Sequence, residues 1–118
     1  MSAFNITRCA HAELLVTDFD KARRFYIEAL GLLEIDSDRE RIYLGGFEER
    51  DRYSLVLRKS TRPGLGHLAF RVANESDLDN LAQLYIAHNC PIRWFEPNEI
   101  EKGQGRALRV QDPFGLPI

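Results

Sequence analysis

The sequence has little cysteine and no long uninterrupted apolar segment. Cys9 and Cys90 are its 2 cysteines, so it offers at most one disulfide, and nothing indicates an oxidising compartment. No apolar run reaches the roughly 20 residues needed to cross a bilayer. The opening residues, MSAFNITRCA, also lack the apolar core of a signal peptide. We therefore expect a reduced, cytoplasmic protein that makes no membrane contact.

The chain also lacks an excess of positive charge. Lysine and arginine number 16 against 18 aspartates and glutamates, which gives a formal net charge of −2. This balance provides no electrostatic footprint for nucleic acid or for an anionic membrane surface. A hydrophobic fraction of 44% and a charged fraction of 29% are ordinary for a globular protein. A length of 118 residues predicts one domain, 1–118, with a real core.

Against this background, the segment HAELLV (11–16) alternates in a way that is typical of a strand. His11, Glu13 and Leu15 share one face, and the residues between them share the other. We expect a strand over about 8–16, after a disordered lead over 1–7. Cys9 falls on the same face as His11, where a buried and inert thiol is the default interpretation.

An amphipathic helix is predicted directly after this strand, over about 19–30. Thr17 or Asp18 can cap its N-terminus, with Asp20 in a capping-box position relative to Thr17. Gly31 stands where a left-handed C-cap is expected. Apolar residues recur at helical spacing between these ends, at Phe19, Ala22, Phe25, Tyr26, Ala29 and Leu30.

The same pattern returns 56 residues later. HLAFRV (67–72) matches HAELLV (11–16), with histidine first and valine last in both segments. Polar capping residues and a second amphipathic helix, over about 76–88, follow it, with Asn89 as its expected C-cap. Agreement of the histidine, the strand and the cap indicates a duplication. The repeat predicts two β-α-β-β-β units, over 8–59 and 66–118, joined by a linker over 60–66.

Further strands complete each predicted unit. The first unit gains strands at 32–36, 41–44 and 53–57, and the second at 92–95 and 106–110. Asp112-Pro113-Phe114-Gly115 has the residues of a type I turn. The second unit is then one strand short. An unpaired sheet edge attracts a partner strand, so we expect a homo-oligomer.

This tandem plan resembles the vicinal oxygen chelate superfamily, which includes glyoxalase I, the bleomycin-resistance proteins and the extradiol ring-cleaving dioxygenases. The segments that carry the resemblance are RCAHAELLVTDFDKARRFYIEALGL, YSLVLRKS, GHLAFRV and KGQGRALRVQDPFGLPI. Within the superfamily they are most similar to the N-terminal domain of the 3,4-dihydroxyphenylacetate (homoprotocatechuate) 2,3-dioxygenases. The resemblance implies an α+β fold in which the two units form a half-open barrel around a ligand cup.

The resemblance also implies where a metal would bind. Ligands in this superfamily stand on the first strand of each unit and on the last strand of the second. Those places correspond to His11, to His67 and to the position after Ile118, which usually holds a glutamate. Two histidines and a carboxylate on one face suit Fe(II) or Mn(II) and leave positions for substrate. In the full-length enzyme, a catechol-type aromatic substrate and O2 would bind there.

Three functions follow as alternatives. The first is the N-terminal domain of an extradiol catechol dioxygenase, mainly structural and inactive alone, with catalysis in a second domain beyond Ile118. The second is a single-domain, glyoxalase-like, metal-dependent isomerase or lyase. The third is a metal-free binder of the bleomycin-resistance type. His11 and His67 are ligands or relics packed inside the cup, and Glu13 is better explained as a solvated or salt-bridged residue than as a substitute ligand.

Overall fold

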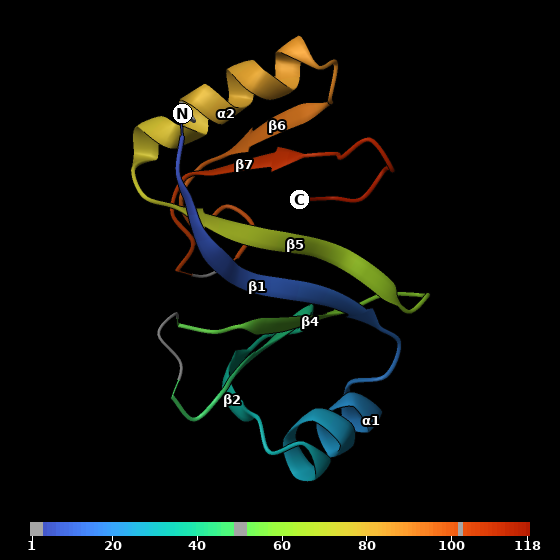
Figure 1. Ribbon diagram of the computed structural model, residues 1–118. Helices are drawn as coiled ribbons and strands as arrows, with labels where there is room; N and C mark the ends of the chain where they lie inside the picture. The colour runs from blue at the N-terminus through green and yellow to red at the C-terminus, as the bar shows by residue number, and fades with distance from the viewer. Residues whose placement is uncertain (1–3, 49–51, 102) are drawn as a thin grey trace. The chain divides into compact units, whose positions relative to one another are not determined.

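The computed structural model describes residues 4–48, 52–101 and 103–118, and it shows an α+β protein, as predicted (Figure 1). No helix in these ranges is both long enough and apolar enough to cross a membrane. The elements, in chain order, are β1 (Ile6–Val16), α1 (Phe19–Arg23), the π-helix η1 (Arg24–Ala29), β2 (Leu33–Ser37), β3 (Arg41–Gly45), β4 (Leu55–Lys59), β5 (Gly64–Val72), α2 (Glu75–Ala87), β6 (Ile92–Phe95) and β7 (Ala107–Val110).

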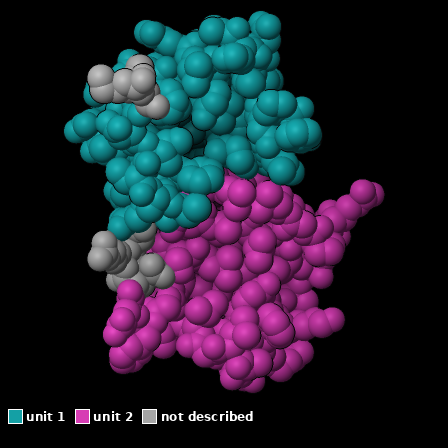
Figure 2. All heavy atoms as spheres, in the orientation of Figure 1, with its two compact units in different colours: residues 1–9, 70–118 teal, residues 10–69 magenta. Residues whose placement is uncertain are grey.

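The chain divides into two compact units, which Figure 2 colours separately. Unit 2 contains residues 10–69, and unit 1 contains residues 1–9 together with 70–118. The long strands β1 and β5 each contribute residues to both units. The sequence division into repeats at 8–59 and 66–118 concerns a duplication and stays a prediction.

Unit 2 is built on a sheet with strand order β2-β3-β4-β1-β5. Strand β4 runs parallel to β1 and antiparallel to β3, and β3 runs antiparallel to β2. One face of the sheet packs against α1 and η1, because alternate strand residues there are apolar. The buried centre of this layer is Ala22, Ile42, Leu44 and Leu57. Leu14 and Val16 of β1 pack against it, which confirms the predicted facing of the first strand.

The first helix covers the predicted range but differs in its detail. Asp18 is the N-cap and its carboxylate accepts a hydrogen bond from the backbone N–H of Lys21 at 3.1 Å. The alternative cap at Thr17, with its capping box to Asp20, is therefore wrong. The last six helical residues form a π-helix, and Gly31 then takes a left-handed φ of 82°, as predicted.

Unit 1 contains α2 and the antiparallel pair β6–β7. The Asp77 carboxylate accepts a hydrogen bond from the backbone N–H of Asn74 at 2.9 Å and so caps α2. Asn89 takes a left-handed φ of 58° beyond the helix end. The guanidinium of Arg106 lies 4.0 Å from the ring centre of Trp94 and 2.8 Å from the Asp79 carboxylate. This hydrogen bond holds the pKa of Asp79 below its usual value.

The predicted turn after β7 is present. The Asp112 carboxylate accepts hydrogen bonds from the backbone N–H groups of Phe114 and Leu116, both at 2.8 Å. Gly115 takes a left-handed φ of 86° there. Beyond the turn, Val110 and Ile118 exchange two backbone hydrogen bonds, at 2.9 and 2.8 Å. The chain therefore returns alongside β7, as the turn residues indicated.

Several strand boundaries differ from the prediction. Strand β1 begins at Ile6, inside the predicted disordered lead over 1–7. Strand β4 begins at Leu55, two positions later than expected, and β5 begins at Gly64, inside the predicted linker 60–66. Glycine and proline usually mark loops, but glycine also occurs in a strand where another group approaches the backbone closely. Gly66 is such a position, as the site geometry below shows. The charged run from Glu48 to Arg52 favours an exposed connection before β4, and residues 49–51 of it lie outside the described residues.

Replacing Ile42 by alanine tests the helix-covered core. Ile42 is 0% exposed and lies in the layer beneath α1, whereas Ile35 on β2 is 43% exposed. We expect Ile42→Ala to lower the free energy of unfolding by about 2–5 kcal/mol, because it leaves a cavity in a packed layer. Ile35→Ala should cost clearly less. Urea unfolding followed by circular dichroism measures both, and equal losses would contradict this assignment of the core.

Candidate metal centre

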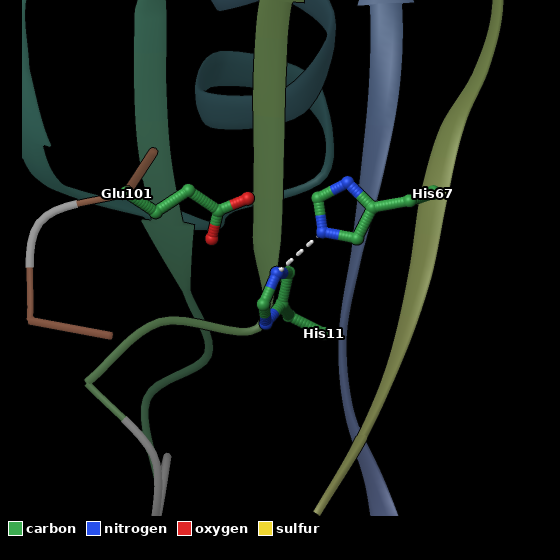
Figure 3. A group of neighbouring side chains, drawn as sticks. All are labelled: His11, His67 and Glu101. Carbon is green, nitrogen blue, oxygen red and sulfur yellow. Dashed lines mark hydrogen bonds between the residues drawn. The ribbon is translucent and has the colours of Figure 1, made fainter. Parts of the chain in front are cut away.

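The site is set by the pairing of β1 with β5. The backbone N–H of Ala73 donates to the carbonyl of Asn5 at 2.9 Å, and the Thr7 hydroxyl contacts the Arg71 carbonyl oxygen at 3.1 Å. The partners advance in opposite directions along the chain, which is the antiparallel pattern. His11 on β1 and His67 on β5 therefore stand on neighbouring strands of the sheet. The prediction that the two histidines share one face is confirmed, because their Nε2 atoms lie 3.0 Å apart (Figure 3).

Aromatic rings surround His11 on this face of unit 2. The His11 ring packs edge-on against His67, with ring centres 5.1 Å apart, and against Tyr53, at 5.3 Å. Tyr53 in turn packs against Tyr43 at 4.9 Å. His67 is 3% exposed, and both tyrosines are buried. His67 is therefore removed from water while His11 is half-buried, and this partial burial strengthens an electrostatic interaction between the two rings.

Glu13, two residues after His11 on β1, places a carboxylate beside this pair. It is 2% exposed. Its Oε1 lies 2.9 Å from Nε of Arg58 and 3.6 Å from Nδ1 of His67, and its Oε2 lies 3.4 Å from Nε of Arg41. Burial raises the pKa of Glu13, but the combined effect of His67, Arg58 and Arg41 is larger and leaves that pKa below its ordinary value. The carboxylate is thus ionised at neutral pH.

The chemistry of the histidine pair fits a divalent cation. Imidazole nitrogens bind such ions at about 2.0–2.1 Å. Two nitrogens at about that distance in neighbouring octahedral positions are separated by about 3.0 Å. The 3.0 Å between the Nε2 atoms matches this spacing. It also matches a hydrogen bond in which one Nε2 carries the proton and the other accepts it.

Comparison with known proteins identifies the family. Residues 8–118 match the profile of the Glyoxalase/Bleomycin resistance protein/Dioxygenase superfamily. The chain belongs to this superfamily. The resemblance seen in the sequence is therefore confirmed for its fold and family.

Within the superfamily the chain is similar to extradiol dioxygenases. It is 36% identical over 111 residues to a metapyrocatechase of Pseudomonas sp. (strain CF600), covering 93% of this chain and 36% of that protein. A manganese-dependent 2,3-dihydroxybiphenyl 1,2-dioxygenase of Geobacillus genomosp. 3 is 30% identical, over 96% of this chain and 36% of that protein. This chain therefore spans about a third of the length of the relatives it matches.

Solved structures give the same result. Homoprotocatechuate 2,3-dioxygenase from Brevibacterium fuscum, in an anaerobic complex with 3,4-dihydroxyphenylacetate, matches with a TM-score of 0.91 and 43% identity. The match covers 98% of this chain and 36% of that chain. The superfamily member described here is thus similar to the N-terminal domain of that enzyme, as the sequence segments indicated.

The remaining predicted residues have mixed outcomes. Glu13 is salt-bridged, as expected, but it is buried rather than solvated. Cys9 is exposed, so the expected burial of its thiol is wrong. Glu101, in the segment of unit 1 between β6 and β7, is a carboxylate with 1% exposure that the sequence interpretation did not single out. Its only sequence signal is a position in a polar loop, which gives no reason to expect burial.

Gly66 should not tolerate a side chain, because Glu13 occupies that space. A Cβ built at Gly66 would lie 2.9 Å from both Cγ and Cδ of Glu13. We expect Gly66→Ala to lower the free energy of unfolding by about 1–3 kcal/mol through overpacking. Gly64→Ala, on the same strand, meets only Leu15 Cδ1 at 4.0 Å and is the matched control. Chemical denaturation compares them, and equal stability of the two variants would refute the close packing of Glu13 on β5.

Proposed function

We propose that this chain is the N-terminal domain of an extradiol ring-cleaving dioxygenase, and that the whole protein opens a catechol ring beside its two hydroxyl groups with O2. The observation that carries this proposal is the similarity to homoprotocatechuate 2,3-dioxygenase over nearly the entire chain. Metapyrocatechase and 2,3-dihydroxybiphenyl dioxygenase, the other relatives, bear names that belong to the same reaction class. The exact catechol follows from none of these relatives, so the proposal is limited to the class.

The role of this domain in the whole protein would be structural. We propose that a second domain holds a complete His-His-Glu triad and the catechol, while this domain supports it and the oligomer. The fraction of each relative that the chain covers, about a third, supports a division of labour of this kind. Ring cleavage would then need residues beyond this chain.

We further propose that His11 and His67 of unit 2 bind a divalent cation, Fe(II) or Mn(II). The 3.0 Å separation of their Nε2 atoms, the burial of His67 and the imidazole donor type support this. When bound, such an ion supplies Lewis-acid and one-electron chemistry to a catechol-type ligand. This observation favours a second candidate function, metal-dependent catalysis on the domain itself.

Metal titration tests the proposed site. We expect the wild-type chain to bind Mn(II) or Co(II), with each of His11→Ala and His67→Ala weakening the affinity at least about tenfold, because each removes one ligand of a small set. His88→Ala is the matched control, since His88 is exposed at the end of α2. Isothermal titration calorimetry measures affinity, and the visible absorption of Co(II) reports the ligands.

Two further comparisons in the same titration test which residues bind the cation. Binding that is unchanged in both histidine variants would show that the cation binds elsewhere. Glu101→Gln, measured in the same series, removes the buried carboxylate of unit 1. A loss of affinity in that variant would assign the third ligand to Glu101, and unchanged affinity would leave that position to water or substrate.

Activity of the isolated chain separates the two candidate functions. We expect the chain, loaded anaerobically with Fe(II) and then given O2 and 3,4-dihydroxyphenylacetate, to form no yellow ring-opened product. The reason is that the proposed triad lies in a domain outside this chain. The full-length protein prepared in the same way is the positive control. Turnover by this chain at ordinary enzyme rates would overturn the structural role and favour catalysis on the domain itself.

A further inference from the structure

We propose that Glu13 is a positioning residue: it orients His67 and fixes its tautomer, so that the His67 Nε2 lone pair faces the cation shared with His11. This inference deepens the metal site of the proposed function and rests on it. Glu13 would then act on the site without being a ligand itself, in addition to the two histidines that bind the cation. The contacts that support this role all lie within unit 2.

The two nitrogens of His67 face different groups. Nδ1 lies 3.6 Å from Oε1 of Glu13, and Nε2 lies 3.0 Å from Nε2 of His11. A neutral imidazole carries one N–H, and an ionised carboxylate can only accept. At 3.6 Å the contact with Glu13 is electrostatic rather than a hydrogen bond, and it favours the proton of His67 on Nδ1, on the side of Glu13. This leaves the lone pair of Nε2 directed at His11, which is the arrangement that a metal-binding histidine with a carboxylate partner adopts.

Glu13 itself is placed to orient a ligand rather than to act as one. Each of its oxygens lies beside an arginine, Oε1 beside Arg58 of β4 and Oε2 beside Arg41 of β3. Its approach to His67 is on the Nδ1 side, away from the contact with His11. The two guanidinium groups hold the Glu13 side chain from β3 and β4, and this fixes the carboxylate on the Nδ1 side of the His67 ring.

The strand that carries His67 is shaped to admit this carboxylate. Gly66, immediately before His67, is buried, and the Cγ and Cδ atoms of Glu13 fill the space that a Cβ would occupy there. A residue with any side chain at that position would push Glu13 away from His67. Close packing of Glu13 against β5 is thus an observation independent of the charge contacts, and it places the carboxylate beside the His67 ring.

The alternative is that Glu13 only pairs with the arginines to hold the strands together. Both roles predict a loss of stability when Glu13 is changed. They differ in what happens to the proton of His67 and to metal affinity. Glu13→Gln keeps the size of the side chain and removes its charge, so it separates these consequences. Arg58→Gln is the matched control, because it disturbs the ion pair and leaves the carboxylate beside His67.

The experiment combines two readouts on the full chain. Long-range ¹H–¹⁵N spectra of the metal-free chain report the tautomer of His67, and titration with Mn(II) reports affinity. We expect wild type and Arg58→Gln to show the Nδ1–H tautomer, and Glu13→Gln to lose that preference. Affinity for Mn(II) should fall about 10- to 100-fold in Glu13→Gln, the usual cost of removing such a partner, and by less in Arg58→Gln.

The outcomes distinguish this inference from the proposed metal site. An Nε2–H tautomer of His67 in the wild-type chain would overturn the inference directly, even if Glu13→Gln did not fold. Unchanged tautomer and unchanged Mn(II) affinity in a folded Glu13→Gln would also overturn it. If the wild type binds no Mn(II), the metal site fails. The tautomer comparison then still supports the orienting role when Glu13→Gln changes it, and overturns that role when it does not.

Discussion

A single ionised carboxylate in the middle of the sheet constrains the rest of unit 2. Glu13 on β1 draws its partners from three other strands: Arg41 from β3, Arg58 from β4 and His67 from β5. An isolated carboxylate buried to this extent would cost several kcal/mol, so all four strands must keep the register that brings these partners together. A slip of β1 by one residue would turn Glu13 into the apolar layer that contains Leu14, and would expose the apolar side chains instead.

The charged residues around Glu13 and the helix-covered core lie on opposite faces of the sheet. Leu14 and Leu57 point toward α1, while their neighbours Glu13 and Arg58 point to the opposite face. Strict alternation along each strand therefore produces both layers from the same residues. The histidine pair lies on the polar face, beside Tyr53, where α1 does not cover it. The face opposite the first helix therefore carries the charged and imidazole groups of the site.

Features set by residues close together in the sequence could be predicted, whereas features set by residues far apart in the sequence mostly could not. The caps at Asp18 and Gly31, the extent of both helices and the turn at Asp112 are local, and their residues predicted them. The match of His11 with His67 was also predictable, because HLAFRV (67–72) repeats the pattern of HAELLV (11–16). Burial of Glu13 was not, since it depends on cations that reach it from β3 and β4. The strand character of Gly64–Gly66 and the π-helix likewise depend on packing partners that no local pattern contains.

The contact between Glu13 and His67 also bears on whether the histidine pair is a relic or a set of metal ligands. The two states of the pair differ in the position of one proton, on His11. In the proposed tautomer, with the His67 proton on Nδ1 beside Glu13, the Nε2 of His67 presents a lone pair whether or not a cation is bound. A simple hydrogen bond between the rings then requires the proton on Nε2 of His11, while a shared cation requires it on Nδ1 of His11. His67 is therefore prepared in the same way for both states. The two states of the pair, a hydrogen bond between the rings or a shared cation, therefore differ in which nitrogen of His11 carries the proton.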